Sequence, residues 1–190
     1  MSRAYRISMK ESDTRCLKAG DEIGTRLEIL DILPPEDMGT LLRNELKNRG
    51  FQEQDNGTMT RSDGTVTVTV DPCSGEVTVQ AQAEETVNQE AKREASGFND
   101  VGPNEESLRG RVKEQLKHDL DKKFEQEQSR LQSEATEQLE RHLQKIQPEI
   151  SEIVNKVTRD ALKQKAQQLG AVKEISEDAE TGSLTIKLEV

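Results

Sequence analysis

The chain has 190 residues, of which 31% are hydrophobic and 34% charged, and its 27 basic and 37 acidic residues give a formal net charge of −10. This composition supplies too few apolar side chains for one compact core along the whole length, so we expect part of the chain to be exposed helix or linker. The acidic balance repels phosphate backbones, and we therefore expect no nucleic-acid partner.

The hydropathy pattern also argues against a membrane partner. No stretch approaches the roughly 18 to 20 continuous apolar residues that span a bilayer, and the first residues lack the apolar core of a signal peptide. We therefore predict a cytoplasmic protein, in which Cys16 and Cys73 remain reduced thiols.

Residues 1–83 predict a small α+β head that begins with a strand. Apolar and polar residues alternate at 4–9, which is the period of a half-buried strand. The apolar segment 25–33 is ambiguous between a strand and a short helix, and we interpret it as a strand.

The head continues with a helix and a meander. Residues 35–49 predict a helix, because proline followed by acidic residues favours a helix start and Gly50 favours its end. Valines and threonines then alternate within 58–83, which predicts antiparallel strands. The sequence DPCSG at 71–75 predicts a type I turn whose glycine takes the left-handed conformation.

The end of the chain repeats the pattern of this turn. Residues 178–186 match 71–79 in the aspartate, the glycine, the threonine and the apolar positions. Either the same favourable turn arose twice, or a helix–hairpin unit is duplicated. Because an isolated two-stranded hairpin is marginal in water, we expect the strands within 170–190 to join the sheet of the head.

Between the head and this hairpin, residues 84–103 predict a polar, partly helical linker, and 104–169 a long helical arm. Apolar residues recur every four positions along the arm and form a stripe one residue wide. Such a stripe can pack against one neighbouring helix but cannot line a core of several layers. Pro148 is the expected position of a bend, because proline removes a backbone donor. Beyond it the apolar pattern widens, which indicates packing on the sheet.

No catalytic, cofactor-binding or metal-binding constellation is present in the sequence. His118 and His142 lie on the arm, whereas Cys16 and Cys73 lie in the head, and no metal-ligand or phosphate-loop spacing occurs. We therefore predict no enzymatic activity and no cofactor. The alternative is a ligand-binding or enzymatic head that uses Cys16, Cys73 or Asp71.

Two segments resemble known families. The C-terminal 36 residues, with a helix, a glycine, a strand, an acidic turn and a final strand, resemble the end of Ycf35-like small proteins. The segment LEILDILPPEDMGTLLRNELKNRGF resembles small accessory proteins encoded beside AAA-type ATPases in bacterial NTP-dependent conflict systems. These resemblances imply an accessory or adaptor subunit.

The leading hypothesis is a non-enzymatic adaptor or assembly subunit of α+β class, with a small sheet, a short helix, a long arm and a C-terminal hairpin. The arm would bind a protein partner, a second copy of the chain or an AAA-type ATPase. The predicted interface is Leu116, Leu120, Phe124, Leu131, Leu139 and Leu143. The alternative is that this stripe folds back on 84–96 or 149–169 of its own chain.

Overall fold

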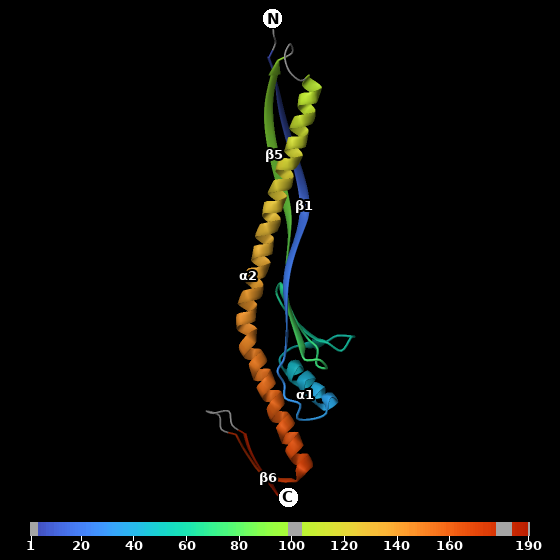
Figure 1. Cartoon of the computed structure of the whole chain (residues 1–190), viewed down its shortest axis with the longest axis vertical. Coiled ribbons are helices and arrows are strands. Elements are labelled where there is room, and N and C mark those ends of the chain that lie inside the picture. The colour runs from blue at the N-terminus through green and yellow to red at the C-terminus, as the bar shows by residue number, and fades with distance from the viewer. Residues whose placement is uncertain (1–3, 99–103, 178–183, 190) are drawn as a thin grey trace. The chain divides into compact units, whose positions relative to one another are not determined.

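The computed structural model describes residues 4–98, 104–177 and 184–189 (Figure 1). The helices are α1 (Pro35–Asn48) and α2 (Glu105–Leu169). The strands are β1 (Ala4–Arg26), β2 (Gln52–Glu53), β3 (Met59–Asp63), β4 (Val66–Val70), β5 (Glu76–Phe98), β6 (Ala171–Glu177) and β7 (Leu184–Glu189). One sheet has the order β1-β5-β4-β3-β2, and β6 pairs with β7 in another. The predicted α+β class is confirmed.

The chain divides into two compact units that differ from the predicted head and arm. Unit 1 contains residues 1–20 and 82–136, and unit 2 contains residues 21–81 and 137–190. The division cuts across β1, β5 and α2, because each of these long elements contributes one part to each unit.

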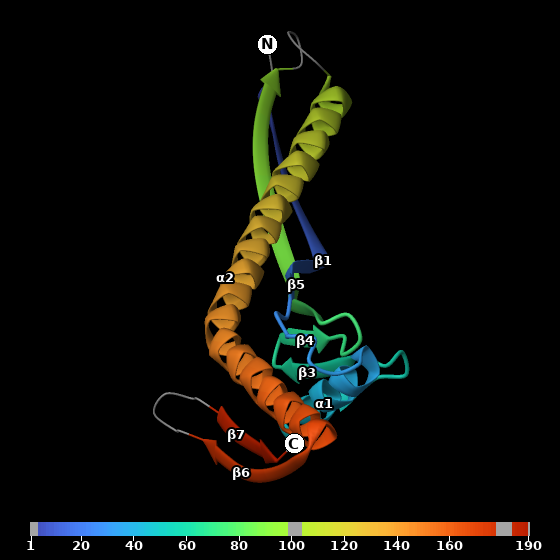
Figure 2. The same ribbon diagram turned by 60° about the horizontal axis from the view of Figure 1, so that its bottom comes forward.

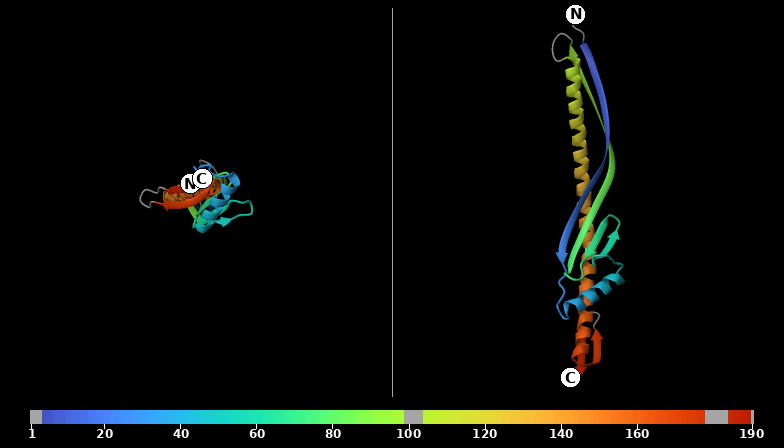
Figure 3. Two further views of the ribbon diagram at one scale, coloured as in Figure 1. Left: turned by 90° about the horizontal axis from the view of Figure 1, so that it is seen from below. Right: turned by 90° about the vertical axis from the view of Figure 1, so that its right-hand side faces the viewer.

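Unit 1 is a two-stranded ribbon of β1 and β5 with α2 against one face (Figure 3). The stripe on the helix is buried against small and medium-sized side chains of the ribbon. Its cluster contains Val112, Leu116, Leu120, Phe124 and Ala91, with Met9, Leu17, Val87 and Ala95 partly buried beside them. Three of these residues lie within 84–96, so the intramolecular alternative for the stripe describes unit 1 correctly.

The predicted linker at 84–103 is wrong for its described part, because β5 continues to Phe98. The strand was hidden in the sequence because its inward positions alternate between apolar and polar residues. Ala91 is buried, whereas Arg93 also faces α2 and binds Asp119 with nitrogen–oxygen distances of 2.5 and 2.9 Å. The apolar period is thus four, which resembles a helix pattern.

Ion pairs between β1 and β5 stabilise the outer face of the ribbon. Lys10 Nζ lies 2.6 Å from a carboxylate oxygen of Glu90, and Arg6 pairs with Glu94. Opposite charges that face each other across neighbouring strands support their pairing. They also compensate for the low strand propensity of glutamate and lysine.

Unit 2 contains the larger core, which lies between the sheet, α1 and the second part of α2 (Figure 2). The inward face of β4 and β5 is lined by alternating valines, which contact leucines of α1 and apolar residues of α2. The buried members include Val66, Val68, Val70, Val77, Val79, Leu42, Leu46, Ile153, Val157 and Ala161. The expected packing of residues beyond Pro148 on the sheet is confirmed.

The predicted helix at 35–49 is confirmed, and its C-terminal end shows why it stops there. Gly50 has φ of +82°, and its N–H donates to the carbonyl of Lys47. The N–H of Phe51 donates to the carbonyl of Leu46, 3.0 Å away, and both side chains enter the core. This is the Schellman arrangement, which needs a residue that accepts positive φ.

The turn between β4 and β5 also follows the prediction. The carboxylate of Asp71 accepts hydrogen bonds from the Cys73 N–H at 2.8 Å and the Ser74 hydroxyl at 2.7 Å. These bonds lower the pKa of Asp71. Gly75 has φ of +73°. Asp71 therefore stabilises the turn, and the hydrogen bonds within the turn explain its lowered pKa.

Three other expectations for this part of the chain need correction or qualification. β1 ends at Arg26, and residues 27–34 form no strand, although Leu27 and Leu33 are buried. β6 and β7 form a sheet of their own and do not join the sheet of the head (Figure 2). α2 runs through Pro148 as a single helix. The repeated turn at 178–183 lies outside the described residues.

Candidate functional site

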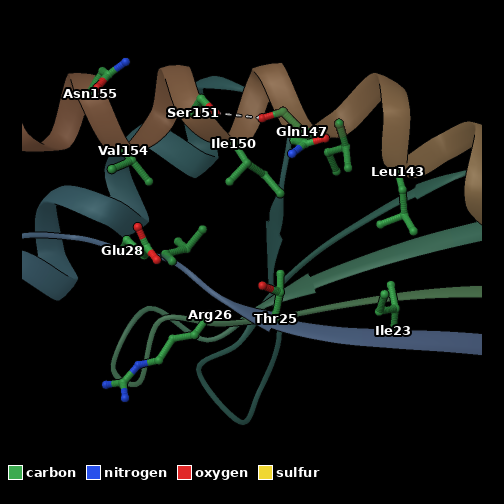
Figure 4. Close-up of a pocket in the computed structure, with 12 residues that line it drawn as sticks. Ile23, Thr25, Arg26, Glu28, Leu143, Gln147, Ile150, Ser151, Val154 and Asn155 are labelled. Atoms are coloured by element: carbon green, nitrogen blue, oxygen red, sulfur yellow. Dashed lines mark hydrogen bonds between the residues drawn. The ribbon is translucent and has the colours of Figure 1, made fainter.

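A groove of about 610 Å³ in unit 2 is lined largely by apolar surface (Figure 4). One wall is the end of β1 with the residues that follow it, and the other is one face of α2. No residue of β4 or β5 lines it. The groove therefore opens beside β1, on the outer side of the sheet.

The helical wall is formed by residues spaced three and four apart, which places them on one face of α2. Leu143, Ile150 and Val154 are half-buried and point toward the β1 wall (Figure 4), and Ile146, which also lines the groove, is buried. These residues are the edge of the core that neither the sheet nor α1 covers. They are thus anchored by the core and still accessible from the groove.

The opposite wall takes its residues from alternate positions of β1. Ile23 and Thr25 point toward the helix, whereas Arg26 points away, and its Nε donates to the carbonyl of Ser74 at 3.0 Å (Figure 4). Leu27, which is buried, also lines the groove. Ile23 is 44% exposed, although it is a large apolar residue. Together with the helical wall, Ile23 forms a continuous accessible apolar surface, of the kind that marks interaction sites.

The segment that forms the β1 wall of the groove is acidic in sequence. Residues 21–31 contain Asp21, Glu22, Glu28 and Asp31 against the single cation of Arg26. Unit 2 as a whole has 22 acidic and 13 basic residues, so it carries −9 of the net charge of −10, and unit 1 carries −1. A cationic partner is therefore attracted to unit 2.

The residues predicted as an interface are placed mainly inside the chain. Leu116, Leu120, Phe124, Leu131 and Leu139 are buried. Leu143 alone among them is half-buried and lines the groove. A stripe with one accessible residue offers little contact area to a partner, so the groove replaces it as the candidate site.

The sequence contained part of the signal for the groove. The apolar pattern beyond Pro148 predicted packing of this part of the helix on the sheet. It did not predict that Ile150 and Val154 would remain partly accessible. Ile23 was missed because it lies between the strands predicted at 4–9 and 25–33, and Thr25, the first residue of the second one, was assigned no site. The alternation in β1 is weak there, since charged residues occupy several inward positions.

The histidines and cysteines are distributed over both units. Cys16 and His118 belong to unit 1, whereas Cys73 and His142 belong to unit 2. His142 Nδ1 lies 4.0 Å from an oxygen of Asp63, too far for a hydrogen bond. No group of three or more acidic, histidine or cysteine side chains within the described residues is arranged to hold a metal ion.

Cys16 is bound to a carboxylate, which makes it a weaker nucleophile. Its Sγ donates to Glu84 Oε1 at 3.0 Å, and this bond to the neutral thiol raises the pKa of Cys16. We expect Glu84→Gln to lower that pKa and so to increase the rate of alkylation by iodoacetamide at pH 8. Peptide mass spectrometry measures the rate, with Cys73 as the internal control. Slower labelling of Cys16 in the variant would contradict this account.

Neither helix in the described part of the chain has an apolar segment long enough to cross a bilayer. Among known proteins, the whole chain, residues 1–190, matches the model of a family described as FtsH ternary system domain X5. No curated protein and no solved structure matches the chain. The resemblance to Ycf35-like proteins is not confirmed, whereas an accessory protein of an ATPase-associated system is consistent with the match. The chain belongs to the family of FtsH ternary system domain X5.

Proposed function

We propose that the chain is a non-enzymatic adaptor that binds a protein partner in the groove between β1 and α2. The observation that carries this proposal is the accessible apolar face of Ile23, Leu143, Ile150 and Val154 in a hollow of about 610 Å³. Interfaces are commonly centred on such anchored apolar residues with a polar rim. Here Gln147, Ser151 and Asn155 form part of the rim.

The lining of the groove favours binding over catalysis. Four of its six polar side chains are uncharged, and the two charged ones, Arg26 and Glu28, come from the same wall and have opposite signs. General acid–base chemistry requires a titratable group directed at the reacting atom. The groove instead presents accessible apolar side chains, as a docking site requires.

The family places the chain in an FtsH system, which suggests an FtsH-type ATPase as the partner. The sequence has no phosphate-binding loop, so the adaptor would depend on the ATPase for nucleotide hydrolysis. In this role unit 2 would bind the ATPase or a protein presented to it.

This proposal is tested with the purified full chain and the FtsH-type ATPase of the same organism by biolayer interferometry. We expect Ile23→Asp to weaken binding by about tenfold or more, because it places a charge in an apolar contact. Leu162→Asp is the matched control, since Leu162 is 39% exposed against 44% for Ile23 and does not line the groove. Equal affinities of the two variants, or no binding by the unchanged chain, would refute the proposal.

A further inference from the structure

We infer that the groove binds an extended, basic segment of a partner protein, which adds as a strand to the edge of β1 at Gly24 and Arg26. The inference rests on the proposed function and specifies the chemistry of the partner. It depends on three features of unit 2: the free backbone edge of β1, the alternation of its side chains, and the charge around the groove.

The first feature is the edge itself. β1 is the outermost strand of its sheet, with β5 as its neighbour on the other side. The N–H of Leu27 donates to the carbonyl of Gly75 at 2.8 Å, immediately before β5 begins. Backbone groups of successive residues in a strand point in opposite directions. The N–H and carbonyl groups of Gly24 and Arg26 are therefore directed away from β5, toward the open edge.

The same alternation is observed within unit 1. There the carbonyls of Lys18 and Gly20 accept hydrogen bonds from the side-chain amides of Gln128 and Gln132, at 2.7 and 2.9 Å. Side chains of α2 thus satisfy the edge of β1 in unit 1, as folded proteins commonly do with exposed strand edges. In unit 2, the N–H of Glu22 binds the carboxylate of Asp21, 2.9 Å away. Gly24 and Arg26 come next along this edge.

The second feature is the side-chain pattern that an added strand would meet. Ile23 and Thr25 point into the groove, and the apolar face of α2 lies opposite (Figure 4). A strand beside β1 would direct every second side chain toward Leu143, Ile150 and Val154, and the others toward solvent. Recognition by strand addition combines such pockets for alternate side chains with backbone hydrogen bonds. The bound segment should therefore alternate apolar and polar residues.

The third feature, the charge of unit 2, determines which charge the polar residues of the bound segment should carry. Four acidic residues and one basic residue lie within 21–31, and unit 2 carries a net charge of −9. Basic residues in the bound segment are attracted by this surface, and acidic residues are repelled. A second copy of the chain is a poorer candidate, because the chain carries a net charge of −10 and its C-terminal residues 171–189 contain five acidic and two basic residues. We therefore assign the groove to another protein and not to a second copy.

The probe for this inference is a labelled eight-residue peptide that alternates isoleucine and lysine, with binding measured by fluorescence anisotropy on the full chain. The control peptide carries glutamate in place of lysine, and we expect it to bind at least about tenfold more weakly. Failure of the lysine peptide to bind, or equal affinity for both peptides, would overturn the assignment of a basic segment.

Backbone pairing is tested without any substitution by amide hydrogen exchange of the unchanged chain. At saturating peptide, exchange at Gly24 and Arg26 should slow by about tenfold or more, because their N–H groups enter new hydrogen bonds. The amide of Leu27 is the internal control, since it already donates to Gly75. Unchanged exchange at Gly24 and Arg26 in the bound state would overturn strand addition.

Gly24 also offers a matched pair of variants. Gly24→Pro removes one edge donor but leaves the bonds to β5 intact, and proline is tolerated on edge strands. In Gly24→Ala the added Cβ meets no atom within 4 Å. We expect proline to weaken peptide binding by about tenfold and alanine by less than about twofold. Equal binding by both variants, with Leu27 still protected, would contradict the inference.

These outcomes separate the inference from the proposed function. If Ile23→Asp weakens ATPase binding but Gly24→Pro does not, the adaptor proposal stands and strand addition fails. If the ATPase does not bind the unchanged chain while the peptide assays succeed, the adaptor proposal fails and the groove chemistry stands. A doubled mass in light scattering that Gly24→Pro abolishes would identify a second copy as the occupant and overturn the assignment to another protein.

Discussion

Leu116→Ala is expected to lower the free energy of unfolding of unit 1 by about 2–5 kcal/mol, the usual cost of replacing a fully buried leucine by alanine. Leu116 is 0% exposed and packs in the cluster that joins α2 to the ribbon. On the ribbon side the cluster includes Val87, Ala91 and Ala95, whose short side chains cannot fill the space that the substitution leaves. Urea unfolding, with hydrogen exchange of β1 and β5 amides as the reporter for unit 1, measures the loss.

Lys117→Ala is the control, because Lys117 is the next residue along the helix and is exposed. We expect it to change stability by less than about 0.5 kcal/mol. Light scattering adds a second readout. If Leu116→Ala left stability unchanged and reduced the mass of an assembly, the stripe would be an intermolecular contact, and the packing described for unit 1 would be incorrect.

The sequence predicted best those elements whose local chemistry and packing agree. α1 has proline and acidic residues at its start, a glycine at its end and leucines on one face, and each of these features points to the same helix. The turn at 71–75 was predicted equally well, because Asp71 and Gly75 have conformational roles that few other residues can take. Local signals sufficed for these elements.

The sequence failed where long-range pairing overrides local preference. Much of β1 and β5 is charged, and their inward positions include Arg15 and Arg93, which contact α2. Arg15 lies over the ring of Phe124 with its guanidinium carbon 4.3 Å from the ring centre, and its Nη2 binds Asp121 at 2.9 Å. Such inward cations remove the alternation on which strand prediction depends. The ribbon was therefore divided into a short strand and a linker.

The candidate site was hidden for a related reason. The apolar residues of the groove lie on β1 and on α2, more than 100 positions apart, and their exposure depends on which part of the core α2 leaves uncovered. The pattern beyond Pro148 indicated that Ile150 and Val154 are apolar contacts. It carried no information on whether the chain itself or another molecule covers them.

Glu149→Gln is expected to destabilise unit 2 by about 1–3 kcal/mol near pH 7, because it breaks a partly buried, bidentate ion pair. Both oxygens of Glu149 accept hydrogen bonds from Arg61 at 2.7 Å, and the two side chains are only 25% and 26% exposed. Arg61 also lies over the ring of Phe51, 4.6 Å from its centre, and donates to the carbonyl of Arg49. The pair thus connects α2 to β3 and to the end of α1.

The dependence on pH distinguishes this ion pair from simple packing. The hydrogen bonds from Arg61 lower the pKa of Glu149 in the folded protein. Its contribution is therefore fully present above the unfolded pKa of about 4.3 and is lost as the pH falls through the lower, folded value. We expect the stability difference between the unchanged chain and Glu149→Gln to be constant near neutral pH and to shrink below about pH 4.3. Urea unfolding at a series of pH values measures it.

Glu152→Gln provides the matched control on the same helix. Glu152 contacts Arg49 at 3.1 Å but is 70% exposed, so water and salt screen its ion pair. We expect this variant to change stability by less than about 0.5 kcal/mol, with little response to salt or pH. Equal losses for the two variants would show that helix charge, and not the buried geometry around Arg61, stabilises this part of α2. A loss for Glu149→Gln that persisted unchanged to pH 2 would attribute it to packing, since protonated glutamate and glutamine carry the same charge.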